Sequence, residues 1–218
     1  MHIDQLYRSI TEHENWISSE EVSGSRLSLC GATLSGMNLR GALLQRSQLQ
    51  GAHLPSCDFS HANLNGAGLQ DSYLHKTNFY GARLMGASLK GANFHGTNLN
   101  YADLRGADLR GTDLRNASLV ETILPELTWV IYGETYYVQI TNGLTLRVGC
   151  QEHPIADWRQ FSKETVQCMD GQKALDFYPR LIDIIDFCMG DGERPEWVPP
   201  TPFNSQPPMS PHLAFGPV

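Results

Sequence analysis

Residues 102–120 read ADLRGADLRGTDLRNASLV, and the five-residue period of this stretch extends over residues 26–124 without insertion or deletion. Every fifth residue from Leu29 to Leu124 is large and apolar, which gives seventeen leucines and three phenylalanines in twenty repeats. The residue two places earlier is Ala, Ser, Thr or Cys in eighteen of the twenty repeats. Glycine fills eleven of the nineteen positions two places after the large residue. This internal repeat is the strongest structural signal in the chain.

A period of five excludes both regular secondary structures as the origin of the repeat. A helix needs apolar residues at i, i+3, i+4 and i+7, and a half-buried strand needs alternation by two. The pattern fits a chain that turns after each short extended segment and sends one large and one small side chain inward. The glycine column supplies the backbone freedom that each corner requires, including positive φ. Where Arg46, Lys76, Tyr101 or Glu121 replaces glycine, the turn must be of a kind that tolerates a side chain.

Two successive segments, Ala102 to Gly106 and Ala107 to Gly111, both read ADLRG and resemble the A(D/N)LxG motif of the pentapeptide repeat family. The resemblance covers about a hundred residues. It implies a mainly β protein built on a right-handed quadrilateral β-helix, with four pentapeptides per coil and about five coils. Residues twenty apart would then form internal ladders, such as Phe59 with Phe79. We expect the coil interior to be full, so that any function lies on the outside.

Four segments follow from the pattern. We expect an N-terminal capping helix (1–23), the β-helix (24–125), a small C-terminal α+β domain (126–190) and a proline-rich tail (191–218). The helical spacing of Leu6, Ile10 and Ile17 predicts an amphipathic helix over residues 3–18, above the first coil. The expected role of this helix is to cover the open end of the coil stack.

The α+β domain has its own local signals. Asn142-Gly143 lies between two strand-like segments, 136–140 and 144–148, and predicts a hairpin. Pro154 suits a first helical position, and Ser162 is the expected N-cap of a short helix that ends at Met169. A longer helix over about residues 172–189 should stop at Gly190, and Pro179 should kink it or mark its start.

Composition and charge exclude several classes of function. The 218 residues carry a formal net charge of -7, from 16 basic and 23 acidic residues, which disfavours binding to nucleic acid by phosphate neutralisation. Neither a membrane helix nor a secretory signal is apparent. Five cysteines at irregular spacing give no disulfide framework. We therefore expect a protein of the bacterial cytoplasm that is not bound to a membrane.

Charge is distributed unevenly along the chain. Residues 24–124 contain nine basic and six acidic residues, a net charge of about +3, whereas residues 1–23 carry about -4 and residues 125–218 about -6. The coil therefore lacks the uniformly negative field of DNA. The candidate partner-binding residues are acidic side chains of the long helix and of the segment after it. They are Asp176, Asp183, Asp186, Asp191, Glu193 and Glu196.

A second segment, Gly149-Cys150-x-x-His153-x-Ile155-x-x-Trp158, resembles one that follows the coils in some phage and prophage pentapeptide repeat proteins. The resemblance implies a phage-borne origin and assigns no reaction to Cys150, His153 or Trp158. Cys150 and His153 could join Cys168 and Cys188 in a zinc site, or act as a nucleophile and base, but the spacing supports buried thiols and a packed histidine better. We assign no catalytic, metal or cofactor residue.

Three functions remain open on the sequence alone. The leading hypothesis is a non-enzymatic module, phage-encoded, that binds and modulates or inhibits a host protein. The first alternative is a DNA mimic that modulates type II topoisomerase, as the family resemblance implies for members related to quinolone resistance. The second is a small metal- or thiol-dependent enzyme domain carried on the β-helix. Homodimerisation through the C-terminal region is expected from the family resemblance and from the need to shelter Trp129, Tyr132 and Trp197.

Overall fold

The structure is a computed structural model that describes residues 3–198, and these form two compact units, 3–126 and 127–198. Residues 199–218 of the expected proline-rich tail lie outside the described residues. In the first unit a helix precedes the coils, and in the second a four-stranded sheet precedes two helices. The elements are α1 (Ile3–Ser18), β1 (Trp129–Ile131), β2 (Val138–Thr141), β3 (Thr145–Val148), β4 (Gln151–Pro154), α2 (Ile155–Trp158) and α3 (Lys163–Met189).

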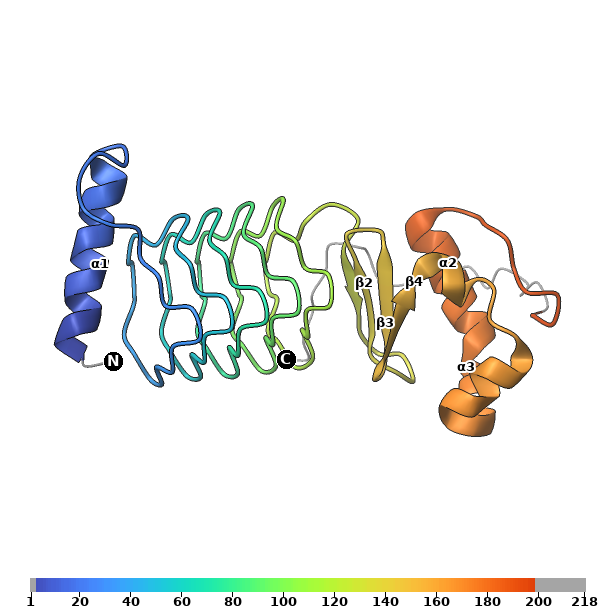
Figure 1. Cartoon of the computed structure of the whole chain (residues 1–218). Coiled ribbons are helices and arrows are strands. Elements are labelled where there is room, and N and C mark those ends of the chain that lie inside the picture. The colour runs from blue at the N-terminus through green and yellow to red at the C-terminus, as the bar shows by residue number, and fades with distance from the viewer. Residues whose placement is uncertain (1–2, 199–218) are drawn as a thin grey trace. The chain divides into compact units, whose positions relative to one another are not determined.

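The repeats of the first unit stack as coils of twenty residues (Figure 1). Residues twenty apart pair through parallel bridges, from Ser28 with Gln48 to Asp103 with Ile123. From Leu29 to Leu104, the N–H group of each large residue donates to a carbonyl of the next coil, as from Leu64 to Arg83 O at 2.7 Å. Four pentapeptides per turn confirm the right-handed quadrilateral β-helix that the sequence predicts.

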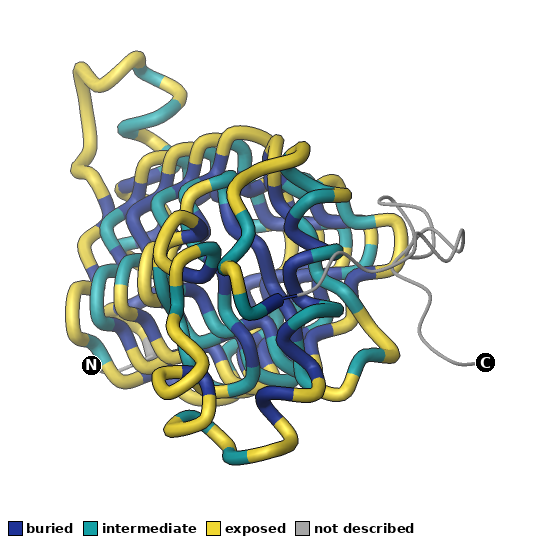
Figure 2. Tube along the Cα trace, turned by 90° about the vertical axis from the view of Figure 1, so that its right-hand side faces the viewer, coloured by how far each residue is buried: buried dark blue, intermediate teal, exposed yellow. Residues whose placement is uncertain are grey.

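The interior of the coils is filled with side chains. Nineteen of the twenty large residues are buried, and Leu124 is half-buried. Figure 2 shows buried backbone positions recurring along the stacked coils. The expected ladder is present, because the rings of Phe59 and Phe79 stack with centroids 5.2 Å apart and planes inclined by 6°. Some inward hydroxyl groups bond to the preceding coil, as from Thr112 Oγ1 to Leu89 O at 3.1 Å, and others bond within their own coil, as from Thr97 Oγ1 to Phe94 O at 2.8 Å.

Every corner of the coils uses the same left-handed backbone conformation. All nineteen residues in the glycine column have positive φ, including the eight that are not glycine. At Lys76 and Tyr101 the φ values are 57° and 61°, close to the 66° of Gly96. The turn therefore tolerates a side chain, and it does so without changing its conformation. The ladder fixes the conformation of the corner, and residues with a Cβ adopt it at a cost in strain.

Helix α1 lies against the first coil, with the bounds that its apolar spacing predicts. Leu6, Ile10 and His13 are its buried residues, and the N–H group of Leu27 in the first coil donates to His13 Nδ1 at 3.1 Å. The helix thereby covers the open edge of the coil stack.

The second unit packs one face of an antiparallel sheet, in the order β1-β2-β3-β4, against α3. Val138, Ile140 and Leu146 point into this core from β2 and β3. The predicted hairpin is confirmed, since Asn142 and Gly143 connect β2 to β3 with φ values of 48° and 66°. Strand β4 was not predicted from the sequence.

The helices of the second unit differ from expectation in two details. Pro154 ends β4 and is the N-cap residue of α2, not its first helical residue. Ser162 caps α3 as predicted, by accepting a hydrogen bond from the Thr165 N–H group. The break in α3 lies at Asp170 and Gly171, whose angles are non-helical, which confirms the predicted division between a helix ending at Met169 and one over about residues 172–189. The prediction that Pro179 kinks the longer helix or marks its start is wrong, because the backbone around it is helical.

Adjacent leucines of the first coil test the filled interior. Leu44 points inward and is 1% exposed, whereas its neighbour Leu43 points outward and is 42% exposed. We expect Leu44→Ala to lower the free energy of unfolding by about 2–5 kcal/mol, because it leaves a cavity. Leu43→Ala should lower it by less than about 1 kcal/mol. Denaturant unfolding of both variants measures the difference, and equal losses would contradict an apolar interior.

The strained corners provide a second test. Lys76→Gly should raise the free energy of unfolding by about 0.5–1 kcal/mol, because glycine adopts a φ of 57° without strain. The control is Lys90→Gly, at an exposed position without positive φ, where added chain entropy should lower stability by about 0.5–1 kcal/mol. A loss of stability in both variants would show that Lys76 is not strained.

Candidate functional site

The acidic residues predicted to bind a partner lie on α3 and on the segment that follows it. Asp176 is exposed and accepts a hydrogen bond from Gln172 Nε2 at 2.7 Å. The segment after α3 exposes three more carboxylates, those of Asp191, Glu193 and Glu196. These four side chains are open to solvent in the described part of the chain.

Asp183 and Asp186 are instead engaged in ion pairs within the second unit. Arg194 donates to Asp183 Oδ1 at 2.8 Å and also pairs with Asp186. Arg159 donates to Asp186 Oδ1 at 2.6 Å, and these two side chains are 13% and 10% exposed. Both carboxylates therefore stabilise the fold, because they anchor the segment after α3 and the loop after α2.

Sequence reasoning missed the two arginines of this network. Arg159 and Arg194 lie 27 and 8 residues from Asp186, and no repeat or motif relates them to α3. Arg159 also donates to the Gly190 carbonyl at 2.9 Å. One signal in the sequence pointed to this network. Asp183 and Asp186 lie between apolar residues of α3, which places their carboxylates close to a buried surface where they need a partner.

The segment from Gly149 to Trp158 forms a hairpin followed by a helical turn. Gly149 and Cys150 are the two-residue connection between β3 and β4, and Gly149 has φ 58°. One positive φ at the first turn position is the pattern of a type II′ hairpin, which requires glycine there. Cys150 is exposed in this turn and Cys168 is exposed on α3, so the expectation of buried thiols at these two positions is wrong.

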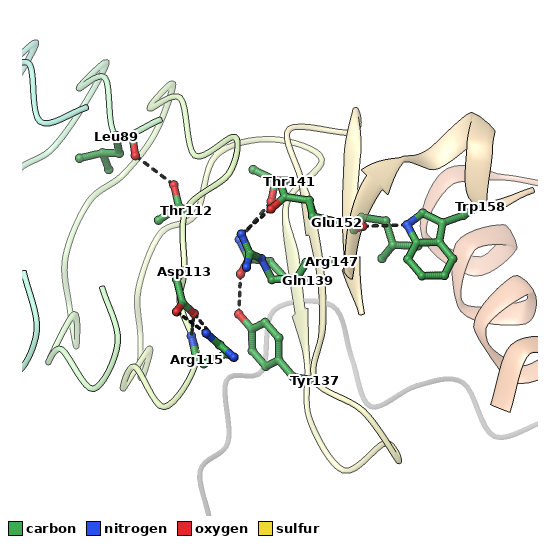
Figure 3. Close-up of polar contacts among 11 residues, drawn as sticks. Leu89, Thr112, Asp113, Arg115, Tyr137, Gln139, Thr141, Arg147, Glu152 and Trp158 are labelled. Carbon is green, nitrogen blue, oxygen red and sulfur yellow. Dashed lines mark hydrogen bonds and ion pairs between the residues drawn. The ribbon is translucent and has the colours of Figure 1, made fainter. Parts of the chain in front are cut away.

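His153 and Trp158 form a packed aromatic cluster with Phe161. The His153 ring meets those of Trp158 and Phe161 edge-on, with centroids 5.4 and 5.1 Å apart. Trp158 is 2% exposed and donates from Nε1 to the Leu146 carbonyl at 2.8 Å (Figure 3). These contacts hold α2 against the sheet, and they give His153 and Trp158 a role in packing.

The segment after α3 docks on the same cluster. Trp197 stacks on Tyr178 with centroids 4.9 Å apart, and its Nε1 donates to the Phe161 carbonyl at 3.0 Å. Trp197 is therefore sheltered within its own chain, whereas Tyr132 remains 45% exposed. Homodimerisation through this region stays a prediction.

A shallow cleft of about 480 Å³ lies between the β1–β2 connection and α3. Arg180 crosses it and donates to Glu134 Oε1 at 2.9 and 3.1 Å. Nearby, Tyr136 donates to Asp170 Oδ2 at 2.6 Å, and burial together with this hydrogen bond raises the pKa of Tyr136 to about 12. Arg180 and Glu134 thus neutralise one another at this cleft.

The coil surface carries ion pairs between aspartate and arginine residues of the same repeat. Asp103, Asp108 and Asp113 each pair with the arginine two residues later, as from Arg115 to Asp113 Oδ2 at 2.8 Å (Figure 3). A hydrogen bond from Arg105 is the main cause that lowers the pKa of Asp103, and the stacked Arg83 contributes less. These pairs place opposite charges side by side on the last two coils.

Residues 3–198 contain neither a metal-binding cluster nor a helix suited to a membrane. In this range no group of three or more His, Cys, Asp and Glu side chains lies close enough to hold a metal ion. Nor does any helix within the described residues have the length and apolar character needed to span a membrane.

The repeats match the profile of a known protein family. The profile of the family described as Pentapeptide repeats (8 copies) matches residues 25–60, 56–91 and 87–124. No curated protein matches the chain.

Several solved structures resemble the chain in part. A pentapeptide repeat protein from the cyanobacterium Cyanothece 51142 is 28% identical, with a TM-score of 0.36, over 48% of this chain and 68% of that one. One from the Arabidopsis thaliana thylakoid lumen is 30% identical, with a TM-score of 0.29, over 41% and 59%. QnrB1, a plasmid-mediated fluoroquinolone resistance protein, is 18% identical in a trypsin-treated form, with a TM-score of 0.23, over 45% and 68%. The chain thus spans 59–68% of the lengths of these three proteins.

The two classes of acidic residue on α3 can be separated by matched substitutions. We expect Asp186→Asn to lower the free energy of unfolding by about 2–4 kcal/mol, because it leaves Arg159 partly buried beside a neutral group. Asp176→Asn, on the exposed part of the same helix, should change it by less than about 0.5 kcal/mol. Denaturant unfolding checks both values, and equal stability of the two variants would mean that the ion-pair network contributes nothing.

Proposed function

Because residues 25–124 belong to the pentapeptide repeat family, we propose that this protein is a non-enzymatic module that binds another protein and modulates or inhibits it. The observation that carries the proposal is the filled interior of the coils. Nineteen large side chains occupy the space that a substrate would need, so the coils act through their outer surface.

We place the partner contact on the exposed acidic residues of the second unit. Asp176, Asp191, Glu193 and Glu196 are open to solvent, whereas Asp183 and Asp186 are occupied by arginines of the same chain. A surface of such carboxylates favours a partner with a basic binding site, and it accelerates association more than it tightens the final complex.

The setting we propose is a phage-encoded factor that acts on a host machine in the bacterial cytoplasm. Its support is the likeness of residues 149–158 to a segment of phage and prophage pentapeptide repeat proteins. In this chain the same residues form a hairpin and an aromatic cluster, which is consistent with a scaffold that displays an interaction surface.

A DNA mimic that modulates type II topoisomerase is the second candidate. The overall net charge of -7 favours it, and the net charge of about +3 on residues 24–124 opposes it. On the last two coils each of three aspartates pairs with an arginine, which reduces the negative field there further. Lack of any effect on gyrase supercoiling at near-stoichiometric dose would remove this candidate.

An enzyme domain carried on the coils is the weakest candidate. His153 is enclosed by Trp158 and Phe161, and Cys150 lies in an exposed turn. Turnover of a substrate that is abolished by Cys150→Ala or His153→Ala would replace the interaction proposal with this one.

A paired-variant binding experiment tests the proposed surface. The full chain is used to capture proteins from a bacterial lysate, and the captured protein is then purified and titrated against each variant. Glu193→Gln combined with Glu196→Gln should weaken binding about five- to tenfold and reduce its dependence on salt. The control combines Asp157→Asn with Glu164→Gln, which removes the same charge elsewhere on the second unit. Equal affinity of both double variants would exclude the acidic surface as the contact.

A further inference from the structure

The attachment of α1 to the first coil rests on few side chains. Leu6 and His13 are fully buried and Ile10 nearly so, whereas Tyr7 is 46% exposed. A groove of about 300 Å³ separates part of the helix from residues 38–42. Because few buried side chains hold the helix, the loss of one of these contacts would appreciably lower the fraction of molecules in which α1 is docked on the coil.

Beneath α1 lies the open edge of the coil stack. In later coils the N–H group just before each large residue donates to the preceding coil, as from His53 to Ala32 O at 2.8 Å. The first coil has no preceding coil, so the equivalent N–H groups of Thr33 and Asn38 lack this kind of partner. An uncovered edge of this type is a template for pairing with another strand.

His13 provides a side-chain hydrogen bond between α1 and this edge, beside the backbone bond from the Ser25 N–H group to Glu12 O at 3.2 Å. It is fully buried, and its Nδ1 accepts a hydrogen bond from the N–H group of Leu27. Because Nδ1 is an acceptor, the single proton of the neutral ring is on Nε2. Within the described residues Nε2 is buried and makes no hydrogen bond of ideal geometry, although the Gln45 carbonyl interacts with the ring. A second proton on Nδ1 would point two N–H donors at each other.

The surroundings of His13 oppose a positive charge. Burial is the main cause that lowers its pKa, the Gln45 carbonyl raises it in part, and the Arg26 guanidinium lowers it again. On its own helix the ring of Trp16 stacks on it, with centroids 5.5 Å apart. The other charged groups near this contact are Glu12 and Glu14 on α1 and the ion pair of Arg46 with Glu21.

The connection between α1 and the coil is strained. Glu20 and Glu21 have φ values of 54° and 72°, although neither is glycine. A non-glycine residue in this conformation costs about 1–3 kcal/mol and persists only while its surroundings impose it. Hydrogen bonds of the helix's own C-terminus impose this conformation, from the Glu20 N–H group to Ile17 O at 3.3 Å and from the Glu21 N–H group to Trp16 O at 2.8 Å, so the strain belongs to the end of α1.

We propose that α1 is a releasable cap, and that protonation of His13 breaks its bond to Leu27 and uncovers the edge of the first coil. The sign follows from the pKa of His13, which lies below its ordinary value of 6.5 in the capped state. The contribution of His13 to capping is therefore complete above about pH 6.5 and is lost as the pH falls through the lowered value. Mild acidification releases the cap while the other coils stay folded.

Hydrogen exchange of the full chain tests the proposal, with protection factors corrected for the intrinsic effect of pH. Between about pH 7.5 and pH 5, protection of the α1 amides should fall at least about tenfold, while amides of the inner coils keep theirs. His13→Gln offers a side-chain oxygen to Leu27 and does not titrate, so its α1 protection should be independent of pH. The control His61→Gln, which removes an exposed histidine of the coils, should behave as the parent chain.

A second variant keeps the test decisive if His13→Gln folds poorly. Arg26→Gln removes the repelling cation without altering the buried side chains, so release should occur at a higher pH than in the parent. Constant α1 protection in the parent down to about pH 5, or an unchanged release pH in Arg26→Gln, would overturn the proposal.

Discussion

The apolar ladder inside the coils is the constraint on which the first unit depends. Parallel bridges hold residues twenty apart in register, so one large residue of every pentapeptide lands inward. A shift by one residue would bring polar side chains inside, and this makes the register strongly specified. The same constraint imposes positive φ on every corner, including the eight without glycine. Strain at Lys76 and Tyr101 is a consequence of the ladder.

Because the coils form a filled column, other molecules can contact this unit only at its outer surface and at its ends. The surface of the last two coils pairs Asp103, Asp108 and Asp113 with neighbouring arginines, so these charges are largely balanced. At the first coil the backbone edge is covered by α1, to which the buried His13 contributes a side-chain hydrogen bond. The covered edge and the exposed side chains are therefore where this unit can interact with other molecules.

The second unit shows how residues suited to binding can be used by the fold. Asp183 and Asp186 share a helix face with Asp176, yet Arg159 and Arg194 neutralise them. His153 and Trp158 form an aromatic cluster that secures α2 and, through Phe161, the segment that contains Trp197. A cluster of charged or aromatic residues in the sequence thus has two interpretations, and contacts distant along the chain decide between them.

The sequence by itself determined the β-helix, its coil length, the bounds of α1, the β2–β3 hairpin and the N-cap at Ser162. Each of these features depends on a local sequence pattern, and the pentapeptide pattern occurs twenty times. The break between the helical segments at residues 170–171 also agrees with the sequence prediction. Only the tertiary structure decided that β4 exists, that Pro179 leaves α3 unbroken, that Arg194 binds two of the candidate carboxylates and that His13 accepts from Leu27. The physical reason is that these features depend on contacts between residues far apart in the sequence, and local spacing does not indicate which residues make such contacts.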